Sequence, residues 1–130
     1  MNATAPTALS AIERLDHLAI NVTDITRAKA FYNDLLGLRE IPRPPSFDFP
    51  GAWYRIGPVD IHLVGGLPKA DPHTSRHFCL WVGDVHAAGA EAEKLGLKPN
   101  WNHRKIPGVD RFYINDPDGN QLEFQGAEKI

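Results

Sequence analysis

Two stretches of the chain share one pattern and decide how it folds: HLAINVTDI at residues 17–25 and HFCLWVGDV at residues 77–85. Three residue types recur at matching positions, namely His17 and His77, Val22 and Val82, and Asp24 and Asp84. Farther along, IHLVG at residues 61–65 occupies the same relative place as LEFQG at residues 122–126, so that His62 matches Glu123. Such self-similarity predicts two copies of one unit, residues 13–66 and 75–126, within a single domain spanning residues 13–126.

Each copy begins with a strand-like segment and continues into a helix. Apolar residues alternate along the opening segment, which predicts a strand. Asp24 and Asp84 then stand at the N-cap position of a helix, and Gly37 and Gly96 stand where a left-handed residue would end it. Short apolar runs bounded by turn formers follow, so the expected unit is a strand, a helix and about three more strands.

The period of two along a strand determines where the recurring polar residues point. The histidine of each opening strand lies opposite the alternating apolar residues, and His62 and Glu123 do so in the closing strands. The apolar faces are expected to pack beneath the helices. Four metal-binding side chains are therefore predicted on the other face of the sheets: His17, His62, His77 and Glu123.

Three imidazoles and one carboxylate form a mixed nitrogen and oxygen donor set. Such a set suits zinc, nickel, cobalt, manganese or ferrous iron. Four protein ligands on an octahedral ion leave two adjacent positions for water or for two neighbouring oxygens of a substrate. We therefore expect one divalent metal ion per site, with His62 either as the fourth ligand or behind the ligands as an acid or base.

The composition is that of an ordinary globular protein and limits the classes of partner. Hydrophobic residues make up 42% of the 130 residues and charged residues 23%, and the formal net charge is -2. Acidic and basic residues are interspersed, so no binding to nucleic acid or to a membrane is predicted, and the expected partner is a small molecule. With Cys79 as the only cysteine, no internal disulfide can form.

The ends of the chain and its expected location follow from composition as well. Residues 1–12 are small, polar and proline-containing, and they are expected to form a flexible N-terminal tail, with a short C-terminal tail at residues 127–130. The sequence has neither a long apolar segment nor the pattern of a signal peptide. A cytoplasmic location is therefore expected.

An ordered set of motifs resembles the vicinal oxygen chelate superfamily. The motifs are DHLAINVTD at residues 16–24, AFY at 30–32 with LGL at 36–38, HF at 77–78 with VGDV at 82–85, and DPDGNQLE at 116–123. This superfamily includes glyoxalase I, fosfomycin resistance proteins, extradiol dioxygenases, methylmalonyl-CoA epimerase and bleomycin-binding proteins. The resemblance implies an α+β fold in which two βαβββ modules form curved mixed sheets around a metal site.

The resemblance also implies roles for the candidate ligands. His17, His77 and Glu123 match the ligands used most widely in the superfamily, and His62 occupies the fourth ligand position. Glyoxalases usually have a carboxylate or an amide there, so the histidine keeps the capacity to bind metal but removes one candidate base. The candidate catalytic residues are Glu123 as ligand and base, His62 as ligand or proton shuttle, and Tyr113 as acid or hydrogen-bond donor.

Substrate contacts are expected in two kinds of place. The segment RPPSFDFPGAWY at residues 43–54 combines stiffening prolines with aromatic rings that suit an apolar pocket, although it equally suits a core-closing loop or a dimer contact. Positive charges near loops suit a substrate carboxylate or phosphate. The candidate substrate-binding residues are Arg43, Phe47, Phe49, Trp53, Arg104 and Arg111, and residues 105–109 are a candidate mobile lid.

The predicted function is a metal-assisted reaction of a small substrate bound through two neighbouring oxygens, with glyoxalase I-like lyase or isomerase chemistry as the first choice. The alternatives are an extradiol-type Fe(II) dioxygenase on His17, His77 and Glu123, a fosfomycin-resistance-like transferase, and a non-catalytic protein of the bleomycin-binding type. Strand edges and apolar loops that one chain would leave exposed predict a homodimer. The linker at residues 65–75 permits a metal site within one chain or between two.

Overall fold

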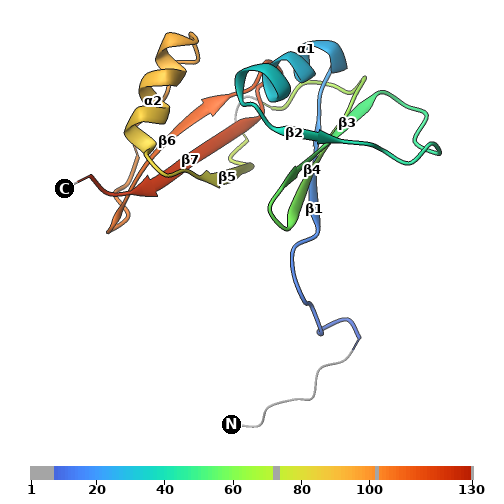
Figure 1. Ribbon diagram of the computed structural model, residues 1–130, viewed down its shortest axis with the longest axis horizontal. Coiled ribbons are helices and arrows are strands. Elements are labelled where there is room, and N and C mark those ends of the chain that lie inside the picture. Colours follow the sequence, from blue (N-terminus) through green and yellow to red (C-terminus); the bar gives the residue numbers. More distant parts are fainter. Residues whose placement is uncertain (1–7, 72–73, 102, 130) are drawn as a thin grey trace.

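The computed structural model describes residues 8–71, 74–101 and 103–129, and this part of the chain forms two mixed sheets with few helices (Figure 1). Its elements, in chain order, are β1 (His17–Asn21), α1 (Ile25–Lys29), the π-helix η1 (Ala30–Leu35), β2 (Arg39–Ile41), β3 (Gly51–Ile56), β4 (Val59–Val64), β5 (His77–Trp81), α2 (Val85–Lys94), β6 (Val109–Asn115) and β7 (Gln121–Ala127). No described helix is long and apolar enough to cross a lipid bilayer.

Both sheets use the same strand pairing, which confirms the α+β class and the repeated unit. The strand order is β1-β4-β3-β2 in the first sheet and β5-β7-β6 in the second. The opening strand of each sheet pairs in parallel with the closing strand, β1 with β4 and β5 with β7, and the closing strand pairs antiparallel with its predecessor. The sheets are curved but not closed, and Figure 1 shows the two modules as neighbours.

The second module departs from the expected set of three strands after the helix. In the described residues, the position of the first of these strands holds only an isolated bridge between Asn100 and Tyr113. Pro99 precedes this bridge and has no backbone N–H to donate to a ladder. The segment therefore pairs with β6 at a single residue and does not form a strand.

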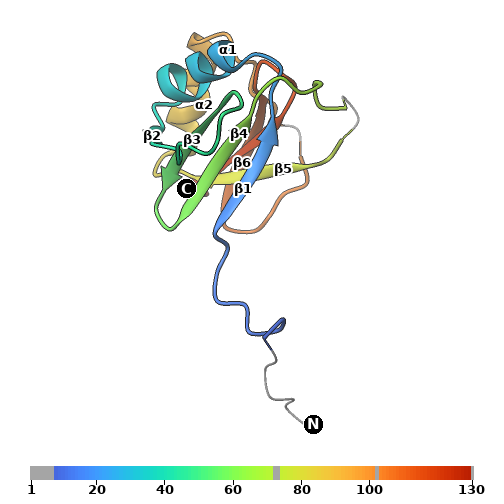
Figure 2. The same cartoon turned by 90° about the vertical axis from the view of Figure 1, so that its right-hand side faces the viewer.

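Alternation along the strands places the apolar side chains as expected. In β1 and β5, every second residue is half-buried and the residues between are exposed, which leaves His17 and His77 on the outer face. Figure 2 shows α1 and α2 on the same side of the molecule. Between helices and sheets lie the largest fully buried apolar side chains, which are Tyr32, Tyr54, Phe112, Ile61, Leu63, Leu122, Val22 and Val85.

The predicted helix ends are confirmed, but the first helix changes type along its length. The side chains of Asp24 and Asp84 accept the N-terminal N–H groups of Arg27 and Ala87 at 3.2 and 3.0 Å. Gly37 and Gly96 have φ angles of 67° and 78°, in the left-handed region. After α1 the chain continues as the π-helix η1, whose wider turn allows the adjacent Phe31 and Tyr32 both to face the core, where they are 3% and 0% exposed.

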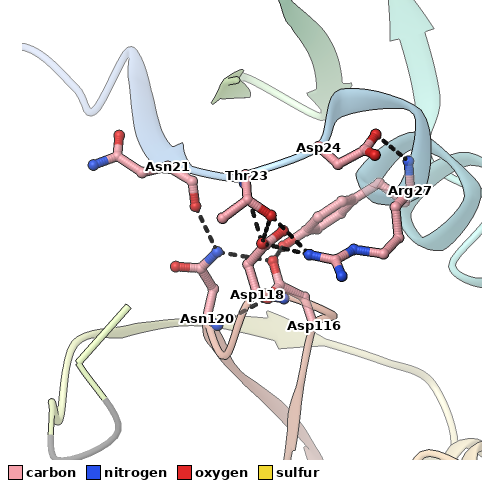
Figure 3. Close-up of polar contacts among 8 residues, drawn as sticks. Asn21, Thr23, Asp24, Arg27, Asp116, Asp118 and Asn120 are labelled. Atoms are coloured by element: carbon pink, nitrogen blue, oxygen red, sulfur yellow. Dashed lines mark hydrogen bonds and ion pairs between the residues drawn. The ribbon is translucent and has the colours of Figure 1, made fainter. Parts of the chain in front are cut away.

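A buried carboxylate joins the two modules (Figure 3). The Oδ1 atom of Asp118, in the turn before β7, accepts hydrogen bonds from the backbone N–H and the hydroxyl of Thr23 at 3.1 and 2.6 Å. The same oxygen accepts a charge-assisted bond from Nη2 of Arg27 at 2.8 Å. The Asp118 side chain is fully buried, whereas the Arg27 side chain is 45% exposed. The second module thus supplies a charge that the first module neutralises.

The neighbouring residues of the same turn extend this junction. Oδ2 of Asp116 accepts a bond from the buried Tyr32 hydroxyl at 2.8 Å. The Asn120 amide donates to the backbone oxygen of Asn21, at the end of β1, at 2.9 Å. The DPDGN segment at residues 116–120 forms the turn between β6 and β7 of the second module. The structure shows that three of its side chains also bind the other module.

Replacing Asp118 with Ala is expected to lower the free energy of unfolding by about 2–4 kcal/mol, because it leaves Arg27 and the N–H of Thr23 without their acceptor. Urea denaturation followed by circular dichroism measures this. Asp48→Ala, which removes an exposed carboxylate, is the matched control and is expected to change stability by less than about 0.5 kcal/mol. Equal effects of the two substitutions would show that the buried junction does not stabilise the fold.

Candidate metal centre

The first pair of candidate ligands, His17 and His62, lies on adjacent strands of the first sheet. Ala19 of β1 is directly opposite His62 of β4, and the two imidazole rings stack with centroids 4.1 Å apart. Trp53, opposite His62 on β3, stacks on the other face of that ring at 3.9 Å and an interplanar angle of 2°. Burial, together with the nearby His17, lowers the pKa of His62 below its usual value.

The second pair, His77 and Glu123, occupies the equivalent place in the second sheet. Nε2 of His77 lies 3.0 Å from Oε1 of Glu123, and the Glu123 side chain is only 7% exposed. The Tyr113 hydroxyl, on β6, is 3.4 Å from the same nitrogen. Cys79 lies opposite Glu123 on β5, but burial and the charge of Glu123 raise the pKa of its thiol to about 11, which disfavours a thiolate ligand.

Hydrogen bonds at Nδ1 orient the rings of His17 and His77. Nδ1 of His77 lies 2.8 Å from the carbonyl oxygen of Ser75, and Nδ1 of His17 lies 2.8 Å from a carboxylate oxygen of Asp16. Both oxygens are acceptors, so each Nδ1 carries a proton, and Nε2 is the nitrogen through which each ring can bind a metal ion. The bond from His17 also lowers the pKa of Asp16.

This proton placement tests whether the second pair fits a metal ion. A lone pair on Nε2 of His77 faces a carboxylate oxygen at 3.0 Å. Two lone-pair atoms repel each other at that distance unless a cation, either a second proton or a metal ion, lies between them or binds both. Imidazole nitrogen with carboxylate oxygen suits the divalent metals predicted from the sequence. The donors present therefore fit the predicted ion.

The four candidate ligands form two half-sites on separate sheets. Within the described part of the chain, no three His, Cys, Asp or Glu side chains are grouped closely enough to hold one metal ion. His17 and His62 belong to the first sheet, and His77 and Glu123 to the second. Each half-site offers two donors and leaves most positions of an ion open. The expected gathering of all four side chains is not seen within this chain.

Arg111, a candidate substrate-binding residue, faces Glu123. Its Nη1 donates to Oε2 of Glu123 at 3.1 Å and to the Tyr113 hydroxyl at 3.2 Å. Its Nη2 donates to the backbone oxygen of Arg104 at 2.7 Å. Arg104 thus contributes its backbone carbonyl to Arg111, and the residue itself is exposed. Burial and the charge of Glu123 raise the pKa of the Tyr113 hydroxyl, which keeps it protonated as a hydrogen-bond donor.

The proline-rich loop forms an aromatic cluster that leads to the first pair. The rings of Phe47 and Phe49 are 5.7 Å apart, and Phe47 meets Trp53 edge-on at 5.2 Å. Arg43 closes the loop, because its Nη2 donates to the backbone oxygen of Phe49 at 2.7 Å and its guanidinium covers the Phe49 ring. Phe47 and Phe49 remain 36% and 43% exposed. An apolar surface therefore adjoins His62, and substrate binding by these residues stays a prediction.

The candidate lid at residues 105–109 is bonded to the second sheet and to the residue that follows β7. Nζ of Lys105 bonds the backbone oxygen of Val109 at 2.6 Å and a carboxylate oxygen of Asp110 at 2.7 Å. It also lies 3.1 Å from a carboxylate oxygen of Glu128. The backbone N–H of Glu128 donates to the oxygen of Gly108 at 3.0 Å. The segment at residues 105–109 is thus held at both of its ends.

The sequence did not predict Asp16 or Ser75 as partners of the ligands, and it predicted a different role for Arg111. Asp16 and Ser75 orient the two histidines, and Arg111 holds the carboxylate. A signal was available for Asp16 alone, since an acidic residue next to a candidate ligand histidine is a common partner for its second nitrogen. The role of Arg111 required knowing that β6 and β7 pair with Tyr113 opposite Glu123.

A sequence profile of the Glyoxalase/Bleomycin resistance protein/Dioxygenase superfamily matches residues 14–124. The chain belongs to this superfamily. It is similar to YwbC of Bacillus subtilis, with 30% identity over 121 residues that cover 86% of this chain and 96% of the relative. It is also similar to Glyoxylase I 4 of Arabidopsis thaliana, with 26% identity, 89% of this chain and 72% of the relative.

Solved structures agree with this membership of the superfamily. A glyoxalase family protein from Bacillus anthracis superposes with a TM-score of 0.79 at 29% identity, covering 90% of this chain and 97% of that chain. The fosfomycin resistance protein FosX from Listeria monocytogenes, solved with Mn(II) and sulfate, superposes with a TM-score of 0.74 at 18% identity, covering 90% and 92%. At that identity, the second superposition supports the fold alone.

Proposed function

We propose that the protein is a metalloenzyme that binds one divalent ion per site and acts on a small substrate through two neighbouring oxygens. The observation that carries this proposal is the second pair, in which Nε2 of His77 faces Oε1 of Glu123 at 3.0 Å while Nδ1 is held by a carbonyl. The Mn(II) present in the FosX structure supports a metal in this fold.

The ligands of the proposed site are His17, His62, His77 and Glu123. The metal ion, when bound, supplies Lewis-acid stabilisation as negative charge develops on a substrate oxygen. Tyr113, protonated and 3.4 Å from Nε2 of His77, would donate a hydrogen bond to the substrate. His62 has no hydrogen-bond partner among the described residues and lies beside the aromatic cluster, so its ring can exchange a proton with a substrate bound there.

Glyoxalase I-like lyase or isomerase chemistry is the reaction we propose first. The relative named Glyoxylase I 4 supports it, as does a set of four donors with proton-carrying side chains next to them. A second candidate is an extradiol-type Fe(II) dioxygenase. The exposed rings of Phe47 and Phe49 favour it, because they offer a stacking surface to an aromatic substrate.

We further propose that two copies of the chain share each site. The two pairs lie on different sheets, and the described residues of one chain bring no three donors together. In a homodimer, His17 and His62 of one copy would meet His77 and Glu123 of the other. The free edges of β1 and β5 border a cavity of about 600 Å³, and a second copy would cover them.

Elemental analysis of the purified protein tests the ligands. His77→Ala and Glu123→Ala are each expected to abolish stoichiometric metal, because deleting one donor weakens such sites steeply. His62→Ala is expected to weaken binding less, since the three ligands that remain are those used most widely in the superfamily. His86→Ala is the control and is expected to retain metal. His86 lies on helix α2, and its ring bonds Asp110 of β6. Full occupancy in both the His77 and Glu123 variants would rule out this site.

The reaction class is tested with the hemithioacetal of methylglyoxal and glutathione in an ultraviolet assay. Turnover that requires added nickel or zinc and is lost in Glu123→Ala is the expected result, because Lewis-acid chemistry needs the ion in place. Absence of turnover with either metal, combined with stoichiometric iron in the purified protein, would instead favour the dioxygenase.

Chain sharing is tested by mixing variants. A His17→Ala chain and a Glu123→Ala chain are each expected to lose metal, and their heterodimer is expected to regain one intact site, because the two lesions then fall in the same shared site. Titration with a chromophoric chelator measures the recovery. Light scattering should give twice the chain mass of 14.4 kDa. Failure to recover metal in a confirmed heterodimer would place each site within one chain.

A further inference from the structure

Arg111 binds the one oxygen of Glu123 that does not face His77. Its Nη1 lies 3.1 Å from Oε2, whereas Oε1 lies 3.0 Å from Nε2 of His77. Both partners of this ion pair are largely buried, with 17% of the Arg111 side chain and 7% of the Glu123 side chain exposed. The two oxygens of the carboxylate therefore have separate partners.

The guanidinium is itself held in place. Nη2 of Arg111 donates to the backbone oxygen of Arg104 at 2.7 Å, and Nη1 also donates to the Tyr113 hydroxyl at 3.2 Å. Charge-assisted bonds of this kind are the stronger class of hydrogen bond. If Glu123 rotated away, the arginine would remain as a buried charge without a carboxylate, which is strongly unfavourable. The geometry thus opposes any movement of Glu123.

We propose that Arg111 is a positioning residue that presents Glu123 to the metal through Oε1 alone and prevents it from acting as a mobile base. This inference rests on the proposed metal site and deepens it. It changes the expectation drawn from the sequence, which gave Glu123 the roles of both ligand and base. Proton transfer then falls to His62 and Tyr113, neither of which is held by an ion pair.

The internal repeat supports a link between Arg111 and the carboxylate. His62 takes the place of Glu123 in the first module, and Gly51 takes the place of Arg111, since these residues occupy the same register in the two sheets. A side chain at Gly51 would collide with the backbone oxygen of Leu63. In the first module, where the candidate ligand is His62, the neighbouring strand β3 provides no arginine at the matching position. In the second module, where the ligand is Glu123, the neighbouring strand β6 provides Arg111.

The test is a double-mutant cycle on metal affinity, with Arg111→Met and Glu123→Gln made singly and together. Cobalt(II) is the probe, its dissociation constant is measured by competition with a chromophoric chelator, and the metal-free melting temperature of each variant is recorded. Arg111→Met is expected to weaken cobalt binding by about 10–100-fold, the usual effect of losing a residue that orients a ligand. In the Glu123→Gln background the same substitution is expected to change affinity by less than about threefold, because its target is gone.

The controls separate this inference from the proposed function. Arg39→Met removes an arginine from the exposed edge strand β2 and is expected to leave cobalt affinity within about twofold of wild type. Arg111→Lys, which keeps the positive charge but places it on a single nitrogen, should recover part of the affinity. Unchanged cobalt affinity in Arg111→Met, or an equal loss in both backgrounds, would overturn the proposed role of Arg111 but not the proposed metal site. A wild-type protein that binds no cobalt would overturn the metal site and this inference with it.

Discussion

The buried carboxylate of Asp118 holds the relative placement of the two modules. No backbone ladder joins the described strands of one sheet to those of the other, so the modules depend on side chains and on the linker for their orientation. A fully buried charge without a partner is costly, and among the described residues Thr23 and Arg27 of the other module provide the partners of Oδ1. This contact, together with those of Asp116 and Asn120, sets the position of each half-site relative to the other.

Within that frame, the two half-sites are organised by different physical means. His62 is held by stacking between the Trp53 and His17 rings, a contact that restricts the ring plane but leaves its nitrogens free. Glu123 is held by directed hydrogen bonds from Arg111 and by its approach to His77. The first arrangement suits a group that exchanges protons, and the second suits a group that must stay in place.

This division bears on the chemistry available to the family fold. Superfamily membership establishes the framework, and reactions as different as those of glyoxalases and dioxygenases use it, so the reaction depends on the site. The site that we propose would combine nitrogen and oxygen donors, a fixed carboxylate, a protonated Tyr113 and an aromatic surface. Those features favour substrates that offer two oxygens to an ion and an apolar or aromatic group to the loop.

The sequence by itself determined the repeat, the caps at Asp24 and Asp84, and the outward face that carries His17 and His77. These features follow from local spacing, because helix and strand periods act on residues only a few positions apart. The tertiary structure decided that the candidate ligands form two separate pairs, that Arg111 faces Glu123, and that Asp118 binds Arg27. The last of these contacts joins residues 91 positions apart. Such partners are selected by strand register and by the packing of modules, neither of which a local pattern specifies.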